Sequence, residues 1–211
     1  MDKLLAVLFE GSLVSVKIFF LTLLFSLPLG LPVAAARMSK NPLLAWPAKV
    51  FILIIRGTPL ILQLIFVYFA PYYIFKVSYN RFTAAIVAMS MNYAAYFAEI
   101  YRGGIESIPK GQYEAGKVLG FTRAQTFFRI VLPQVMKRIL PATGNEVITL
   151  VKDTALAQTI GVAELFRAAQ NAASREFSTV PIFIAGVFYF VMNWIVSTVF
   201  TYIEKKLDYY R

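Results

Sequence analysis

Five apolar segments constrain this chain more than any other feature of its sequence. They cover about residues 12–36, 47–70, 82–100, 139–157 and 181–203, and each approaches the ~20 apolar residues that a helix needs to cross a bilayer. In hydrocarbon every backbone N–H and C=O group must bond within its own segment, so such segments fold as helices. The sequence therefore predicts an all-α polytopic membrane protein of five transmembrane helices, with residues 1–211 forming a single domain.

Composition supports the membrane class and removes several kinds of chemistry. Only 15% of the residues are charged and 59% are hydrophobic, whereas soluble domains carry about 25% charged residues. The absence of cysteine and histidine excludes disulfides, thiolate chemistry and histidine-based catalysis. A net charge of +10 would suggest nucleic acid in a soluble protein, but in a membrane protein it reflects basic cytosolic loops. We therefore expect no enzyme activity, no metal site and no nucleic-acid partner.

Basic residues predict the orientation of the spans. They outnumber acidic residues in the connection after the first span, in the long segment 102–138 and in the C-terminal tail, while the other connections have a far weaker bias. Because Lys and Arg concentrate on the cytosolic side, we expect the N-terminus outside, the C-terminus in the cytosol and residues 102–138 as a cytosolic loop. The basic residues of this face are Arg37, Lys40, Lys49, Arg102, Lys110, Lys117, Arg123, Arg129, Lys137, Arg138, Lys205, Lys206 and Arg211.

The second span carries polar residues where a bilayer is most apolar. Arg56, Gly57, Thr58 and Pro59 lie near its middle, and Pro59 should kink or break the helix because it lacks an N–H and crowds the preceding turn. Half-helix N-termini at the midplane are a recurring carboxylate site in transporters. We therefore expect the backbone after Gly57, with the Thr58 hydroxyl and Gln63, to hold a substrate carboxylate. The alternative is a packing kink in which Arg56 is paired structurally.

The third and fourth spans place further polar residues at a similar depth. Met91 and Asn92 lie roughly 14 Å into the third span at about 1.5 Å per residue, and Glu146 lies at a matching depth in the fourth. An unpaired carboxylate in hydrocarbon protonates or finds a cation, and a cationic amino acid would satisfy it. The alternative is an internal ion pair of Glu146 with Arg56 or with another basic side chain. The candidate substrate-binding residues are Thr58, Leu62, Gln63, Met91, Asn92, Asn145, Glu146 and Thr149.

Three smaller patterns predict an ion pair within a helix, an amphipathic helix and close helix packing. Glu99 should pair with Arg102, three residues further along the same helix. Apolar residues that repeat at helical spacing from Val162 predict an amphipathic outer helix ending at about Ser174. Alanines in the third span have the small-xxx-small spacing that suits close helix packing, within the subunit or across a dimer. These alanines are Ala84, Ala88, Ala94 and Ala98.

The cytosolic loop contains a partial match to a nucleotide-binding motif. Residues 111–117 read GQYEAGK, the opening of the phosphate-cradling P-loop pattern G-x-x-x-x-G-K. However, Val118 stands where Mg²⁺ needs a hydroxyl, no strand precedes the motif, and Glu114 would lie among the phosphates. We therefore expect no nucleotide binding by this chain. Helical spacing over Gln112–Phe128 instead favours a short amphipathic helix lying parallel to the membrane.

The same loop carries a family resemblance. Glu114-Ala115-Gly116, then Gly120 after three residues, then IVLP at 130–133 after nine more, resembles the EAA loop of ABC importer permeases. That consensus is E-A-A, three residues, G, nine residues and I-x-L-P, so Gly116 replaces the second alanine. Four further stretches are similar to polar amino acid permeases of the histidine/glutamine type. They are RGTPLILQL (56–64), EIYRGGIESIPKGQ (99–112), GNEVITLVKDTAL (144–156) and IGVAEL (160–165).

The resemblance implies a type I ABC importer transmembrane domain in the inner (plasma) membrane of a prokaryote. It implies cytosolic ATPase subunits that bind ATP and Mg²⁺, an extracytoplasmic solute-binding protein, and a second permease chain, identical or related. The loop's short helix would dock on the ATPase through Glu114, Ala115 and Gly116, and Gly120 would let the chain turn out of that helix. Several basic amino acid importers of this family have N-E-V-I at the position of Asn145–Ile148, which implies arginine, lysine or histidine as substrate.

A transporter of another class is the competing interpretation. An ion-coupled secondary transporter or a passive channel would also place polar residues in its spans. Such folds usually show more spans and an internal repeat, and the sequence shows neither. Substrate flux through the isolated chain would favour this alternative.

Overall fold

The structure is a computed structural model that describes residues 2–78 and 80–207, and its secondary structure in these ranges is helical. Arg211, which belongs to the basic cytosolic face expected from the sequence, lies outside the described residues. The elements are α1 (Asp2–Arg37), α2 (Pro42–Gly57), α3 (Leu60–Phe75), α4 (Arg81–Glu106), α5 (Lys110–Val118), α6 (Arg123–Thr126), the π-helical turn η1 (Phe127–Val131), α7 (Leu132–Asp153), the 3-10 turn η2 (Thr154–Ile160), α8 (Leu165–Glu176) and α9 (Val180–Leu207).

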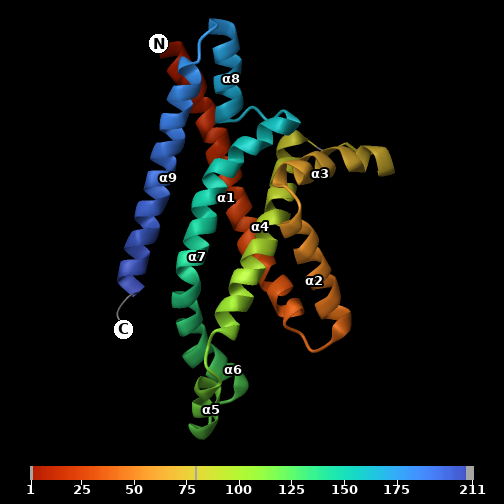
Figure 1. Cartoon of the computed structure of the whole chain (residues 1–211), viewed down its shortest axis with the longest axis vertical. Helices are drawn as coiled ribbons and strands as arrows, with labels where there is room; N and C mark the ends of the chain where they lie inside the picture. The colour runs from red at the N-terminus through yellow and green to blue at the C-terminus, as the bar shows by residue number, and fades with distance from the viewer. Residues whose placement is uncertain (1, 79, 208–211) are drawn as a thin grey trace.

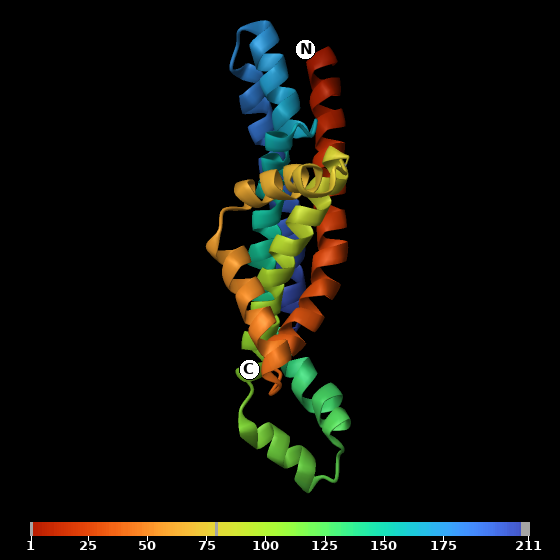
Figure 2. The same ribbon diagram turned by 90° about the vertical axis from the view of Figure 1, so that its right-hand side faces the viewer.

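Four long helices, α1, α4, α7 and α9, run along the length of the molecule (Figure 1). The start of α1 and the short helix α8 lie at one end, and α5 and α6 lie beyond the other end, where α9 also finishes. Figure 2 shows α5 and α6 as a separate foot below the long helices, and α3 crossing them at a steep angle. The loop predicted to be cytosolic and the outer helix therefore lie at opposite ends.

Small residues bring α1 and α4 close together. The alanines Ala84, Ala88, Ala94 and Ala98 are all buried, and on the α1 side a Cβ added to Gly30 would lie 3.1 Å from the Cβ of Phe97 and 3.3 Å from the carbonyl oxygen of Ala94. The close packing predicted from the alanine spacing is therefore confirmed, and these residues pack within the chain. This α1–α4 pair forms the scaffold on which the other helices lie.

The helices agree only in part with the five predicted spans. By length and composition α1 and α9 can each cross a membrane, and the pair α2 and α3 becomes a third candidate only if its bend of 111° is counted within one span. The span predicted over 47–70 is divided between α2 and α3, and the chain leaves the helix at Thr58, where Pro59 predicts a kink or break. The helices over 82–100 and 139–157 are present in α4 and α7, although α7 ends at Asp153 and continues as η2. The count of five spans and their orientation remain predictions.

A buried carboxylate fixes the outer helix α8. Glu164 is fully buried, and its carboxylate accepts hydrogen bonds from the N–H groups of Phe166 and Arg167, both at 2.7 Å, as the N-cap of α8. The hydroxyls of Tyr189 on α9 and Ser15 on α1 donate to the same carboxylate at 2.9 and 3.4 Å. Burial raises the pKa of Glu164, against the lowering effect of these hydrogen bonds. The helix predicted up to about Ser174 is confirmed as α8, and one side chain joins it to two long helices.

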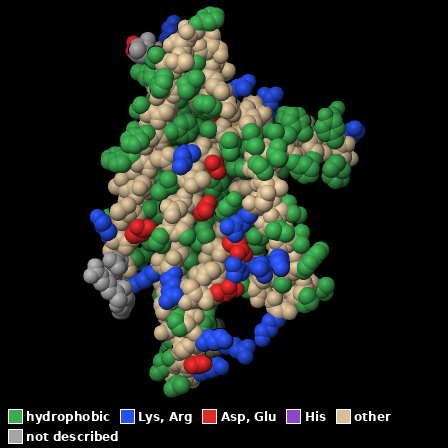
Figure 3. Space-filling model, viewed as in Figure 1, with side chains coloured by type: hydrophobic (Ala, Val, Ile, Leu, Met, Phe, Trp, Pro, Cys, Tyr) green, Lys and Arg blue, Asp and Glu red, His purple; other side chains and the backbone are tan. Residues whose placement is uncertain are grey.

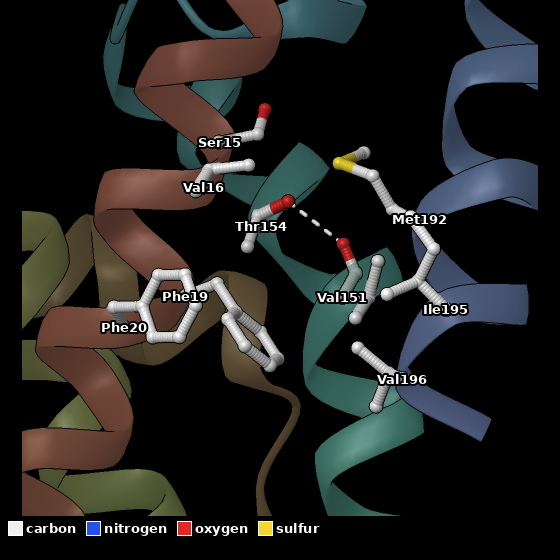
Figure 4. A pocket seen from close by; sticks show the side chains of 9 residues that line it. All are labelled: Ser15, Val16, Phe19, Phe20, Val151, Thr154, Met192, Ile195 and Val196. Carbon is white, nitrogen blue, oxygen red and sulfur yellow. Dashed lines mark hydrogen bonds between the residues drawn. The ribbon is translucent and has the colours of Figure 1, made fainter. Parts of the chain in front are cut away.

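An apolar cavity of about 160 Å³ lies between α1, the end of α7 and α9 (Figure 4). Its two hydroxyls are already engaged, since Thr154 donates to the carbonyl of Val151 at 2.8 Å and Ser15 donates to Glu164. A charged or zwitterionic ligand would lose its hydration in an apolar cavity without gaining polar partners. This cavity therefore does not suit a polar substrate. The lining residues are Ser15, Val16, Phe19, Phe20, Val151, Thr154, Met192, Ile195 and Val196.

Candidate functional site

The candidate site is built around the break between α2 and α3. Thr58 and Pro59 have extended backbone, with φ −121° and ψ 146° at Thr58 and φ −61° and ψ 136° at Pro59. This is the conformation that a proline imposes on the residue before it. The Thr58 hydroxyl donates to the carbonyl of Ile54 at 2.8 Å and so occupies one of the carbonyls that the end of α2 leaves free. The predicted interruption at Gly-Thr-Pro is confirmed.

The side chain of Gln63, in the first turn of α3, bonds polar groups on the α2 side of the break. Its side-chain amide nitrogen lies 2.8 Å from the carbonyl oxygen of Ile55, 3.0 Å from that of Thr58 and 2.9 Å from the Thr58 hydroxyl. Its amide oxygen accepts a hydrogen bond of 2.9 Å from the side chain of Asn92 on α4. Asn92 is only 5% exposed. Three of the residues expected to contact substrate are thus bonded to one another, and they shape the break and attach it to α4.

The start of α3 offers unpaired backbone donors. Its N-cap is Pro59, and no side chain caps it. Within the described residues, no hydrogen bond satisfies the N–H of Leu60 or Ile61, whereas the N–H groups of Leu62 and Gln63 reach the carbonyl of Pro59 at 3.0 and 3.3 Å. The first N–H groups of a helix, together with the helix dipole, attract anions. Leu62 itself is 56% exposed beside these donors.

The α7 side of the candidate site carries Glu146. Asn145 and Thr149 are exposed one turn apart, and Glu146 is partly buried beside them. Within residues 2–78 and 80–207, no basic group lies within 4.0 Å of the Glu146 carboxylate. Glu146 nevertheless lies within electrostatic range of Arg56. On α4, Met91 is 38% exposed next to Asn92.

Arg56 makes its contacts with α4. One guanidinium nitrogen lies 3.9 Å from the Glu99 carboxylate, and the guanidinium carbon lies 5.0 Å from the centre of the Tyr96 ring. The ion pair between Arg56 and Glu146 that the sequence left open is therefore absent from this structure. Arg102 bonds the same carboxylate at 2.7 and 3.0 Å, which confirms the predicted Glu99–Arg102 pair, and Arg37 approaches it to 3.9 Å.

Charged side chains follow the face that contains these helices. In Figure 3 acidic side chains are spaced down the middle of the molecule over α7 and α4, and basic side chains gather towards the end that bears α5 and α6. Sequence reasoning missed Tyr93, which is buried on α4 and donates a hydrogen bond of 2.8 Å to Asp153. A tyrosine in an alanine-rich span was the available signal, because a buried phenol needs a polar partner.

The loop expected to couple to an ATPase folds as two short helices and a π-helical turn. The prediction of one helix over Gln112–Phe128 is wrong, because α5 ends at Val118 and Gly120 has a positive φ of 74°. This conformation suits glycine, as expected for a residue that lets the chain leave the helix. Thr122 then starts α6 with a capping box that it forms with Gln125. Glu114 and Ala115 are exposed on α5, so they remain accessible to a partner.

Gly116 lies where α5 meets α6. A Cβ at this position would lie 2.5 Å from the Thr126 hydroxyl oxygen and 2.6 Å from its methyl carbon. The Thr126 hydroxyl is held in place by donating to the carbonyl of Thr122 at 3.0 Å. The single departure from the EAA consensus is therefore the residue that permits this contact.

Residues 26–209 match the family of binding-protein-dependent transport system inner membrane components. The chain belongs to this family. It is 41% identical over 206 residues to the L-cystine transport system permease protein TcyB of Bacillus subtilis (strain 168), covering 97% of this chain and 88% of that protein. It is 37% identical over 199 residues to the arginine transport system permease protein ArtQ of the same strain, covering 94% and 91%.

A solved structure extends the likeness to three dimensions. A crystal structure of an amino acid ABC transporter with histidines matches with a TM-score of 0.90 and 35% identity, covering 98% of this chain and 96% of that one. The predicted resemblance to ABC importer permeases is thus confirmed, as is the type I importer fold. As a family member the chain is the membrane component of such a transporter, a non-catalytic subunit, and the self-sufficient transporter or channel is set aside.

Proposed function

We propose that this chain forms the translocation pathway of an ABC importer for amino acids with a cationic side chain, such as arginine or lysine. The relatives named above are permeases for cystine and arginine, so family membership supports an amino acid as the substrate. The kind of amino acid has to be inferred from the residues of the site. The observation that carries the proposal is Glu146, a partly buried carboxylate on α7 with no basic group within 4.0 Å among the described residues. A carboxylate at this depth calls for a cation.

The two sides of the site suit the two ends of such a substrate. The N–H groups of Leu60 and Ile61 at the start of α3 would receive the α-carboxylate, and Glu146 would receive the cationic side chain. Asn145, Thr149 and Met91 would line the space between them. Thr58, Gln63 and Asn92 would act by holding the break in shape, because their polar groups are engaged with one another.

The remaining parts of the transporter follow from the family and the foot. A second permease chain would complete the pathway, and an extracytoplasmic binding protein would deliver substrate at the end that bears α8. Cytosolic ATPase subunits, which bind ATP and Mg²⁺, would contact α5 through Glu114 and Ala115, while Gly116, which was expected to join this contact, is buried against Thr126. Nucleotide-driven movement of that foot would tilt α7, which continues directly from η1, and so expose the site to either side in turn. We place the complex in the prokaryotic inner membrane.

Substitution of Glu146 tests the substrate class. In the purified permease–ATPase complex, Glu146→Gln should weaken arginine binding by about 100-fold or more, because a charge-assisted hydrogen bond is lost inside a water-poor site. Glutamine binding, measured alongside as a neutral comparison, should change by less than about threefold. Glu106→Gln on the surface of the foot-side end of α4 serves as the charge-matched control. Unchanged arginine affinity in Glu146→Gln, with an intact complex on size-exclusion chromatography, would contradict the proposal.

A further inference from the structure

A groove of about 430 Å³ lies between α7 and α9, towards the end of the molecule that bears the foot. The two helices run side by side in opposite directions (Figure 1), and a Cβ added to Gly144 on α7 would lie 2.9 Å from a ring carbon of Phe200 on α9. The buried residues of α9, Pro181 and Ala185, lie at its other end, so the groove opens where α9 is least buried. The lining residues are Lys137, Leu140, Pro141, Thr201, Glu204, Lys205 and Leu207.

The charged and apolar residues of this groove are separated by depth. On the predicted topology α9 crosses the membrane towards the cytosol, and it has no charged residue from Val180 to Ile203. At about 1.5 Å per residue this stretch covers roughly 35 Å, close to the ~30 Å of hydrocarbon, so Lys205 lies at the cytosolic edge. On α7, Lys137 likewise lies one turn closer to the foot than Pro141. The groove is therefore largely apolar on its deeper side and charged at its cytosolic mouth.

Basic side chains outnumber acidic ones at this mouth. Lys137 and Lys205 line it together with one carboxylate among the described lining residues, that of Glu204, and Lys206 follows on α9. Lys205 is exposed, and no carboxylate oxygen in residues 2–78 and 80–207 lies within 4.0 Å of its ammonium group. A lysine at the edge of the hydrocarbon extends its ammonium group into the headgroup region. Lys205 is therefore placed to meet an anion of the membrane surface.

We propose that this groove binds an anionic phospholipid of the cytosolic leaflet, with the phosphate at Lys205 and an acyl chain along Leu140 and Pro141. Basic pockets between transmembrane helices on the cytosolic side suit anionic headgroups, and Lys137 adds to the positive potential at the mouth. A small anion such as inorganic phosphate would use the lysine but leave the apolar wall without a partner. The bound lipid joins the least buried part of α9 to α7, and the inference does not depend on which amino acid is transported.

Lipid competition in the permease–ATPase complex tests the proposal. Complexes are taken from nanodiscs of equal parts phosphatidylglycerol and phosphatidylcholine, and the lipids that stay bound are counted by native mass spectrometry. The wild type should retain phosphatidylglycerol preferentially. Lys205→Gln should lower that preference by about fivefold, which corresponds to the ~1 kcal/mol that a basic residue contributes near an anionic surface. Lys205→Arg should keep the preference within about twofold of the wild type.

Two further variants separate the groove from the general charge of the membrane face. Glu204→Gln removes the acid at the mouth and should raise the preference for phosphatidylglycerol by about threefold or more, a gain that misfolding would not produce. Lys49→Gln removes an exposed lysine of the same predicted face, outside the groove, and should leave the preference within about 1.5-fold of the wild type.

Three outcomes would overturn the proposal. Equal losses in Lys205→Gln and Lys49→Gln would assign the preference to the overall charge of the face. Displacement of phosphatidylglycerol by millimolar inorganic phosphate would identify a small-anion site without a role for the acyl chain. No change in either Lys205→Gln or Glu204→Gln would show that another subunit covers the groove in the assembled complex.

Discussion

The break between α2 and α3 and the turn between α5 and α6 both interrupt helical backbone, but different contacts hold them. At the break, the side chains of Thr58 and Gln63 bond the carbonyls that α2 leaves free, and Asn92 attaches the assembly to α4. At the turn, Gly120 supplies a positive φ and Gly116 lies directly against Thr126.

On the predicted topology, which places the break in the membrane and the turn in the cytosol, the difference follows from the surroundings of the two regions. Freed backbone groups at membrane depth have no water to bond, so side chains must satisfy them. In a loop exposed to the cytosol water satisfies the backbone, and the direction of the chain is set by which conformations and close contacts the residues permit. We therefore expect damage to the break to impair substrate binding and stability, and damage to the turn to impair coupling to the ATPase.

Replacing Gln63 should have the largest effect. Gln63→Leu keeps the approximate volume but removes the hydrogen bonds to Ile55 and Thr58 and leaves Asn92 buried without its acceptor. At about 1 kcal/mol per lost hydrogen bond, the complex should lose about 3 kcal/mol of stability, and arginine affinity should fall by about tenfold or more. Thermal unfolding and binding assays would measure the two effects. Gln170→Leu on α8 is the matched control, and equal losses in both variants would refute a special role for the break.

Replacing Gly116 by the alanine of the EAA consensus should distort the turn between α5 and α6. Gly116→Ala places a methyl group against the β-branched side chain of Thr126, and such overpacking costs about 1–3 kcal/mol or rotates α5 away from α6. We expect substrate-stimulated ATP hydrolysis to drop by about fivefold while arginine affinity stays unchanged.

The double variant Gly116→Ala/Thr126→Ala should recover most of the coupling, because the crowding hydroxyl and methyl groups are gone. Gly111→Ala, at a position where an added Cβ meets no atom within 4 Å, provides a control on the same helix. A loss of affinity in Gly116→Ala, or no rescue by the second substitution, would show that the two regions are not separable in this way.

Local sequence rules predicted several features of the two regions and of the helix packing. Pro59 predicted the place of the break, and the alanine spacing of α4 predicted its close packing. The turn at Gly120 was implied by the resemblance to the EAA loop. The partners of polar side chains could not be predicted, because Gln63 and Asn92 are far apart in sequence and meet only once α3 turns by 111° from α2. For the same reason these residues were expected to contact substrate, and the structure shows their amide groups bonded within the protein.

The π-helical turn and the Gly116–Thr126 contact were also beyond sequence reasoning. Periodicity over Gln112–Phe128 suggested one helix, since Gly120 and the capping box at Thr122 divide it without disturbing the pattern of apolar residues. The departure of Gly116 from the EAA consensus looked like a loss of helix propensity. The position of Thr126 in the structure shows that the close contact between α5 and α6 requires a residue without a Cβ at position 116.

A third interruption of the helical backbone lies between η2 and α8. It combines a glycine of positive φ with a side chain that bonds free backbone groups, and a substitution here should have the smallest effect on stability. Gly161 has a positive φ of 81°, and the buried carboxylate of Glu164 bonds the first N–H groups of α8. Glu164→Gln removes the charge and keeps one oxygen acceptor, but it places an NH₂ group where the second carboxylate oxygen accepts a backbone N–H, so about one hydrogen bond, or about 1 kcal/mol of stability, should be lost.

The pH dependence of that small change tests whether the buried charge matters. Burial raises the pKa of Glu164 above its usual value of 4.5, so its contribution to stability is fully present below that pH and declines as the pH rises through the folded-state pKa. The unfolding temperature of the wild type minus that of Glu164→Gln should therefore fall as the pH rises above 4.5. Glu176→Gln, at the exposed end of α8, should give a difference that does not change with pH. If the Glu164 difference is also constant, the carboxyl group ionises in the folded protein as it does in the unfolded chain, and burial does not hold a proton on it.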